Sequence, residues 1–208
     1  IYRVLKIDPE EDMDWKKYSV CAGVFSVLSL FVLWAILCFQ KFLPLNPEGI
    51  EGTSWHLGFN TAASFTTNTN WQAYSGESTL SYFSQMLGLN FQNFVSAAIG
   101  IAVLFALIRG FVRVKKTGIG NFYTDMTKTV LYILIPLSMA LSLVIASQGV
   151  PQTFRQYDEV QMLEPVMVEN EDGTATQVTK AVVPLGPGAS QIAIKQLGTN
   201  GGGFWGNN

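Results

Sequence analysis

The stretch SVCAGVFSVLSLFVLWAILCF, Ser19 to Phe39, decides the fold class of this chain. It contains no charged residue, and as an α-helix it is long enough to cross a hydrocarbon core about 30 Å thick. Cys21 and Cys38 lie inside this run, and we interpret them as small buried apolar residues rather than as a disulfide or a metal pair. We therefore predict a membrane-spanning helix over residues 19–40.

Two further uncharged intervals follow, Ser78 to Ile108 and Thr129 to Phe154. They predict spans over residues 89–109 and 129–148, and Pro136 should kink the second of them. Three buried helices of a large soluble protein are the weaker alternative, since charge-free runs of this length rarely occur in soluble cores. The sequence therefore predicts an all-α polytopic membrane protein.

The composition agrees with a membrane environment. Hydrophobic residues make up 49% of the chain and charged residues 13%, against roughly 25% charged in an average globular domain. The formal net charge of −2 gives no basic field for nucleic acid, so we expect membrane lipid and no nucleic acid among the partners. The single histidine, His56, has no second histidine at metal-ligand spacing.

Lysine and arginine predict the orientation of the spans. The segment 109–128 carries five bases and one acid, whereas the segment 41–88 carries one base and three acids. The positive-inside rule therefore makes 113–128 a cytoplasmic linker and places 41–88 outside. By alternation, residues 1–18 form a cytoplasmic N-terminal segment and residues 149–185 form an outer loop.

The outer loop contains the alternating stretch VMVENEDGTATQVTKAVV around Asp172-Gly173. An Asp-Gly pair between alternating apolar residues is typical of a two-residue hairpin turn. We predict a small extracellular β-hairpin here, with a disordered loop as the alternative.

Two segments are too short to span and are followed by similar polar strips. Residues 53–65 precede TTNTNWQ, Thr66 to Gln72, and residues 187–197 precede GTNGGGF, Gly198 to Phe204. We interpret each segment as a re-entrant pore helix and each strip as a loop that returns to the outer side. The Thr-Asn pairs match at an offset of either 132 or 130 residues, which predicts two repeats: 19–112, and the half repeat 129–208.

The strips have the chemistry of a cation filter. Non-helical backbone at membrane depth survives only where it is buried or lines a wet cavity, and its carbonyl oxygens can replace the water around a cation. The pore helices would direct their partly negative carboxyl ends toward that ion. Because the strips carry no carboxylate, they suit a large monovalent ion better than Mg²⁺ or Ca²⁺.

The stretch NTNWQAYSGESTLSYFSQMLGLNFQNFVSAAIGIAVLFALIRGF resembles the potassium-binding subunits of Kdp-type potassium-transporting ATPases, as do LPLNPEGI and SQIAIKQLGTNGGGFWGNN. The resemblance covers nearly the whole chain and implies span–pore-helix–span repeats with selectivity-filter loops. A second Phe would be expected in place of Trp205, which lies beyond the filter. The family's K⁺-binding residues correspond here to Thr67, Asn68, Thr69, Asn70, Gln72, Thr199, Asn200, Gly201 and Gly202.

The resemblance also implies a function and partners. Such a subunit binds extracellular K⁺, is not catalytic itself, and passes the ion to a P-type ATPase catalytic subunit that is accompanied by small accessory subunits. Its location would be the bacterial inner membrane. Because the chain begins at Ile1 and ends within a motif, we expect an internal fragment without the third and fourth filter loops.

Several alternatives are left open by the sequence. A stand-alone K⁺ channel or ion-coupled symporter fits the same pattern, and a membrane enzyme would need a nucleophile–base pair for which only His56 is available. Gly201 to Gly206 satisfies G-x-G-x-x-G but follows a predicted helix, which argues against dinucleotide binding. Lys195 either tunes the field of the filter or, as we predict, forms an ion pair with an outer acid.

Overall fold

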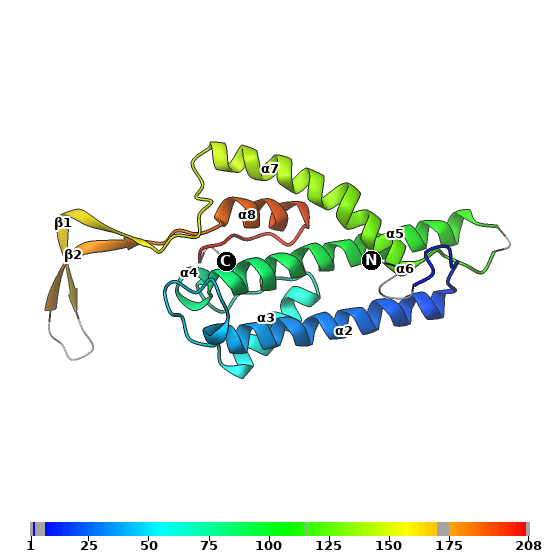
Figure 1. The fold of residues 1–208 in the computed structure, drawn as a ribbon, viewed down its shortest axis with the longest axis horizontal. Coiled ribbons are helices and arrows are strands. Elements are labelled where there is room, and N and C mark those ends of the chain that lie inside the picture. The colour runs from blue at the N-terminus through cyan, green and yellow to red at the C-terminus, as the bar shows by residue number, and fades with distance from the viewer. Residues whose placement is uncertain (1, 3–6, 115, 170–174, 207–208) are drawn as a thin grey trace.

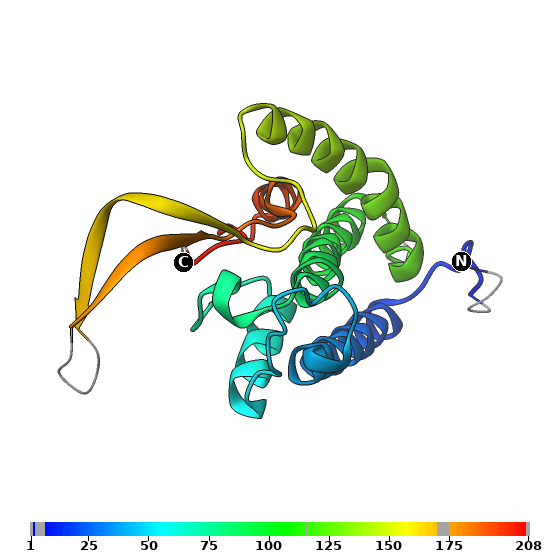
Figure 2. The same ribbon diagram turned by 60° about the vertical axis from the view of Figure 1, so that its left-hand side comes forward.

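The computed structural model describes residues 2, 7–114, 116–169 and 175–206, and it is mostly helical with one projecting hairpin (Figure 1). Three long helical stretches run side by side (Figures 1 and 2). The first consists of α2 (Trp15–Phe39) and a 3₁₀ turn (Gln40–Phe42). The second consists of a π-helical segment (Ser84–Asn90) and α5 (Phe91–Val112). The third consists of α6 (Phe122–Lys128), a second π-helical segment (Thr129–Leu134) and α7 (Ile135–Ser147).

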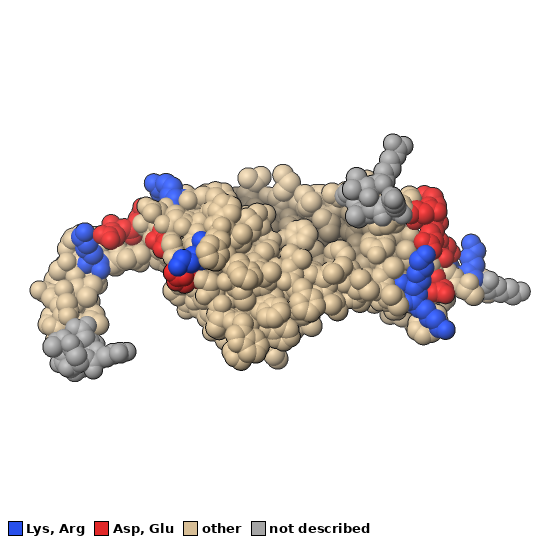
Figure 3. All heavy atoms as spheres, turned by 60° about the horizontal axis from the view of Figure 1, so that its bottom comes forward, with Lys and Arg blue, Asp and Glu red and all other residues tan. Residues whose placement is uncertain are grey.

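All three stretches are long and apolar enough to cross a membrane. Their most apolar windows are only 11%, 33% and 17% buried within the chain, so most of their apolar side chains face outward. Helices that are apolar all round and unburied are expected in lipid rather than in water. The charged side chains on the face in Figure 3 gather at the two ends and leave the middle band uncharged.

The ends of the spans differ from the sequence expectation. The third helix begins at Phe122 rather than at residue 129, because Asn121 Oδ1 accepts a hydrogen bond from Thr124 N at 3.1 Å and caps it. The second half of the predicted cytoplasmic linker is therefore helical. The first span likewise begins at Trp15, where the side chain of Asp14 accepts from Lys17 N at 2.8 Å. Pro136 follows the π-helical turn of the third span, since its ring lacks an N–H and crowds the preceding turn.

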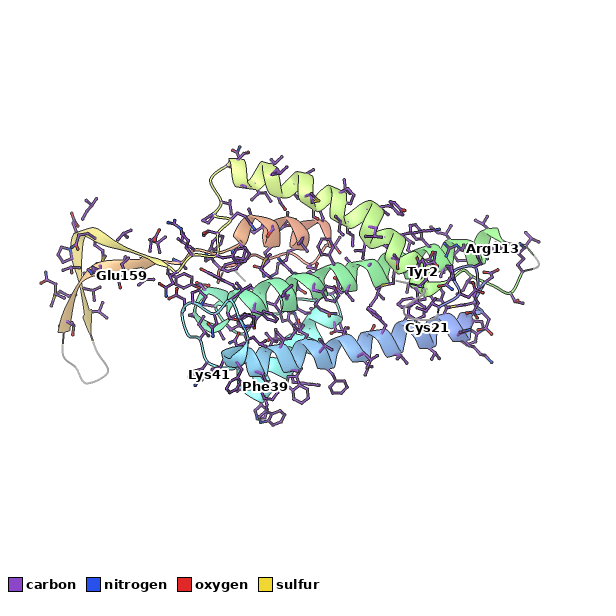
Figure 4. The ribbon with its side chains drawn as sticks, viewed as in Figure 1. Tyr2, Cys21, Phe39, Lys41, Arg113 and Glu159 are labelled. Atoms are coloured by element: carbon purple, nitrogen blue, oxygen red, sulfur yellow. The ribbon has the colours of Figure 1, made fainter. Side chains whose placement is uncertain are left out.

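A buried cluster joins the spans near one end. Phe122 packs edge-on against Tyr18, with ring centroids 5.5 Å apart, and its ring is fully buried. Asp125 receives two hydrogen bonds from Arg109, at 2.6 and 2.7 Å, and one from the Tyr18 hydroxyl at 3.0 Å. A bidentate pair of this kind fixes the register of α2, α5 and α6. Arg113 lies at this end, opposite Lys41 (Figure 4).

The other end of the molecule carries the short elements. The helices are α3 (Trp55–Thr66), α4 (Gly76–Thr79) and α8 (Gly188–Leu197). Helix α3 packs against α2, and α8 packs against α7. Both also contact α5 and lie on either side of it (Figures 1 and 2). Fully buried Leu37, Ala62 and Phe65 form the core between α2 and α3.

An antiparallel hairpin, β1 (Asp158–Glu169) and β2 (Ala175–Val183), projects from this end (Figure 1). Asp158 is opposite Val183, and the register shifts between Gln161 and Val166. The shift contains Pro165, which has no N–H to donate to the ladder. The predicted Asp172-Gly173 turn lies outside the described residues.

Candidate functional site

Two short helices end where the two strips begin. Helix α3 starts after Ser54, whose hydroxyl accepts from Leu57 N at 3.3 Å, and ends at Thr66. Helix α8 ends at Leu197, and Gly198 follows it. These bounds lie close to the predicted 53–65 and 187–197, and both helices lead directly into the residues predicted to bind the ion.

The two strips begin with the same backbone hydrogen bonds. In each, one carbonyl oxygen in the last helical turn accepts from two successive strip N–H groups: Ser64 O in the first strip and Lys195 O in the second. The four bonds of the first strip are Thr67 N–Ala63 O (3.1 Å), Asn68 N–Phe65 O (3.3 Å), Thr69 N–Ser64 O (3.0 Å) and Asn70 N–Ser64 O (3.3 Å). Those of the second are Gly198 N–Ile194 O (2.9 Å), Thr199 N–Gln196 O (3.3 Å), Asn200 N–Lys195 O (3.0 Å) and Gly201 N–Lys195 O (3.1 Å).

This correspondence relates residues that are 131 positions apart, such as Asn68 and Thr199. Both sequence-based offsets, 130 and 132, are therefore wrong for the backbone, because they align like side chains. The structure pairs Thr69 with Asn200 and Asn70 with Gly201. The two strips share a backbone conformation, although different residue types occupy the corresponding positions.

The backbone torsions repeat at the same spacing. Asn68 and Asn70 have φ of 65° and 60°, and their counterparts Thr199 and Gly201 have 61° and 76°. Asparagine and glycine tolerate this left-handed region, but it is strained for a β-branched threonine. Strained backbone concentrates at functional sites, and Thr199 is such a residue. The repetition of the left-handed torsions in both strips points to a shared requirement on their peptide groups.

Amide side chains join the two strips. Asn68 Nδ2 donates to Gly198 O at 3.4 Å and to Thr199 Oγ1 at 3.3 Å, while Asn68 Oδ1 accepts from Asn200 Nδ2 and, at 2.7 Å, from Ser96 Oγ. Strips that are 130 residues apart in sequence therefore lie in direct contact. Ser96 belongs to α5, so the network also fixes both strips to the central span.

The other predicted site residues have partners as well. Asn70 is buried, and its Nδ2 donates to Asn93 Oδ1 of α5 at 2.8 Å. The Thr67 hydroxyl donates back to Ala63 O at 3.0 Å and lies 3.2 Å from that of Thr69. The amide groups of Asn68 and Asn70 thus hold the strips against α5.

A polar hollow of about 570 Å³ opens between the strips. It is lined by Asn60, Thr69, Asn70, Trp71, Gln72, Ala73, Asn200, Gly201 and Gly202. Of the predicted residues, Thr69, Asn70, Gln72, Asn200, Gly201 and Gly202 line it, whereas Thr67, Asn68 and Thr199 do not. The side-chain oxygen atoms of Asn70 and Asn200 receive no hydrogen bond from the described part of the chain. Electron-rich oxygens without a donor fit a cation better than an anion.

The residues that line the hollow are uncharged. Its lining includes no carboxylate, and the partly negative carboxyl ends of α3 and α8 directly precede the strips. Such a site favours an ion that sheds its water at low cost.

Sequence reasoning missed three of the supporting residues and was wrong about a fourth. Asn93, Ser96 and Ser64 hold the strips, and only their proximity in the fold shows it. The predicted ion pair of Lys195 is not found: among the described ion pairs, none includes it. Its ammonium group donates instead to Gln72 Oε1 at 3.0 Å and to Gly203 O at 3.1 Å.

The fold is that of a membrane protein, with three helices long and apolar enough to cross a bilayer. The model of the family described as "Potassium-transporting ATPase A subunit" matches residues 1–208, so the chain belongs to that family. Similar proteins named "Potassium-transporting ATPase potassium-binding subunit" occur in Clostridium botulinum (67% identical), Clostridium perfringens (62%) and Desulfovibrio desulfuricans (57%). Each alignment covers all of this chain and 35% of the relative, so the chain spans about a third of their length.

Proposed function

We propose that the strips 66–72 and 198–204 are two segments of a potassium selectivity filter. Residues 19–112 form a complete span–pore-helix–filter–span repeat, and residues 129–208 form the first half of a second one. In this proposal α3 and α8 are pore helices that enter the membrane from outside and return. The observation that carries the proposal is the shared backbone path of the two strips, which meet at one polar hollow.

The filter removes the hydration shell of K⁺ and replaces it with backbone carbonyl oxygens. The Asn68–Asn200–Ser96 network holds these oxygens in place before the ion arrives, so that little reorganisation is needed. The relatives named as potassium-binding subunits support K⁺ as the transported ion. ATP hydrolysis takes place on another subunit.

The whole protein would then act as the ion-selecting subunit of an ATP-driven uptake complex in the bacterial inner membrane. Its partners are a P-type ATPase catalytic subunit, small accessory subunits and lipid. The bases of segment 109–128 support a cytoplasmic location for that end and for the N-terminal segment. The hairpin and both pore helices, which lie at the opposite end, then face outside.

Replacing Gly201 with Asp tests this function. Gly201 has φ of 76° and open space where a Cβ would lie, so the new carboxylate enters the hollow without a steric clash. We expect weaker K⁺ binding or uptake of other cations, measured as the apparent K⁺ affinity and K⁺/Na⁺ selectivity of cells expressing the complete gene.

Two controls separate the charge from the backbone strain. Gly201→Ala carries the same torsional strain without the charge. Gly49→Asp places a carboxylate at a loop glycine with a similar φ of 64° and equally open surroundings, but outside the hollow. If Gly201→Asp behaves like Gly49→Asp, with affinity and selectivity unchanged, the strips are not the K⁺ site.

A further inference from the structure

The side chain of Lys195 connects the two strips. Lys195 is in the last turn of α8 and is fully buried. Its Nζ donates to the side-chain oxygen of Gln72 in the first strip and to the carbonyl oxygen of Gly203 in the second. Gln72 lines the hollow, so the ammonium group lies one hydrogen bond away from the proposed ion path.

Lys195 has no ion-pair partner among the described residues. In residues 2, 7–114, 116–169 and 175–206, no carboxylate oxygen comes within 4.0 Å of its Nζ. The other close group is the ring of Phe65, whose centroid lies 5.3 Å away. Both hydrogen-bond partners of its Nζ are acceptors, as a protonated ammonium group requires. A buried cation with neutral partners exerts a field that water does not screen.

The two pore helices differ in the charge of their last turns. The residue of the first repeat that corresponds to Lys195 is Ser64, whose hydroxyl accepts from Trp71 N. Helix α3 has no base in its last turn, and α8 has Lys195. A helix carboxyl end carries about half a negative charge, and a full positive charge outweighs it. The second strip therefore presents a less negative field to a cation than the first.

We propose that Lys195 is a specificity-determining residue, whose fixed positive charge makes the filter discriminate against divalent cations. This inference rests on the proposed potassium filter. Electrostatic energy is proportional to the charge of the ion, so Lys195 opposes a divalent ion twice as strongly as a monovalent ion at the same position. Removing the charge of Lys195 should therefore raise the affinity for K⁺. The affinity for a divalent ion of similar size should rise by the square of the factor found for K⁺.

The test uses the complete protein in its complex, with K⁺ and Ba²⁺, two ions of similar radius, as probes. Lys195→Gln and Lys195→Met remove the charge, and Lys195→Arg retains it. The apparent affinity for K⁺ and the inhibition constant of Ba²⁺ are measured for each variant. We expect the ratio of Ba²⁺ to K⁺ affinity to rise about fivefold or more in the neutral variants and to stay within about twofold in Lys195→Arg.

The ratio of Ba²⁺ to K⁺ affinity distinguishes loss of the Lys195 charge from loss of the hydrogen bonds by which Lys195 connects the strips. A distorted filter loses oxygen ligands and weakens Ba²⁺ at least as much as K⁺, so the ratio does not rise. An unchanged or lower ratio in the neutral variants would overturn the inference, as would an equal rise in Lys195→Arg. Recovery of the complex by size-exclusion chromatography identifies variants that do not fold. For those, Gln72→Glu is compared with Thr69→Glu, which sets a carboxylate on the same hollow at a residue that makes no described contact with Lys195. If the charge of Lys195 matters, the ratio rises more in Gln72→Glu, and an equal rise in the two variants contradicts the role of the charge.

The proposed function and this inference fail in different ways. If Gly201→Asp alters K⁺ selectivity while the ratio of Ba²⁺ to K⁺ affinity is constant across the Lys195 variants, only the role of Lys195 is refuted. If Gly201→Asp has no effect, the ion binds elsewhere and both are refuted.

Discussion

Replacing Asn68 with Ala should disrupt the two strips more than any other single loss of an amide in this region. The side chain of Asn68 accepts from Ser96 Oγ at 2.7 Å and from Asn200 Nδ2, and it donates two longer hydrogen bonds to the second strip. Its φ of 65° adds a second requirement, since alanine is less well tolerated there than asparagine.

The size of the expected loss of K⁺ affinity in Asn68→Ala follows from these contacts. The two short hydrogen bonds contribute about 1 kcal/mol each, and the two longer ones add little. Forcing alanine into the left-handed region costs about 1 kcal/mol more. The sum is about 3 kcal/mol, or about a 100-fold loss of K⁺ affinity if the ion requires the strip in its present conformation.

Asn68→Gly separates the two contributions. Glycine loses the same hydrogen bonds but adopts the left-handed conformation freely, so it should recover about 1 kcal/mol, or about fivefold in affinity. Asn46→Ala is the matched control. Its side chain bonds to Ile50 O at 2.8 Å and to Ile50 N at 2.9 Å in a loop away from the strips, so the affinity should not change.

The assay is K⁺-dependent ATPase activity of the purified complex, assembled with the complete gene product. The reasoning is refuted if Asn68→Ala keeps its K⁺ affinity within about twofold of the wild type, far below the 3 kcal/mol expected. It is also refuted if Asn68→Gly binds K⁺ more weakly than Asn68→Ala, because the torsional argument predicts the reverse.

Three further predictions concern packing, stability and orientation. Gly76→Ala places a Cβ 2.3 Å from Phe204 O, so the backbone at the end of the second strip must move, and thermal-shift and K⁺-affinity measurements should both show a loss. Tyr18→Phe removes the buried hydrogen bonds to Ala102 O and Asp125 and should lower the unfolding free energy by about 1–2 kcal/mol, seen as a lower Tm of the complex. In a background without native cysteines, a membrane-impermeant maleimide should label Leu163→Cys in intact cells and label Lys116→Cys only after lysis; the opposite pattern contradicts the orientation.

The three long apolar helices were predictable from sequence because their signal is local. A run of apolar residues such as 19–39 forms a helix in lipid whatever its neighbours do, since every backbone group must be satisfied within the segment. The ends of the spans were less predictable. Asn121 caps a helix that starts within an apparently polar linker, and a single capping side chain leaves a weak pattern.

The strips themselves were recognised from sequence, but their register was not. Matching Thr-Asn with Thr-Asn assumes that like residues occupy like positions, whereas the repeat is carried by hydrogen bonds and left-handed torsions. Asparagine, glycine and, under strain, threonine all adopt those torsions, so residue identity does not reveal the correspondence. Lys195 was misassigned for a related reason: its partners, Gln72 and Gly203, are neutral oxygens that only the folded chain brings together.

Crystals of the complete complex grown with Tl⁺ or Rb⁺ in place of K⁺ test the central claim most directly, because anomalous scattering locates these ions. We predict a peak in the hollow, coordinated by backbone carbonyl oxygens from both 67–72 and 199–202. A bound ion located elsewhere, or one coordinated without oxygen atoms from these two strips, would contradict the account.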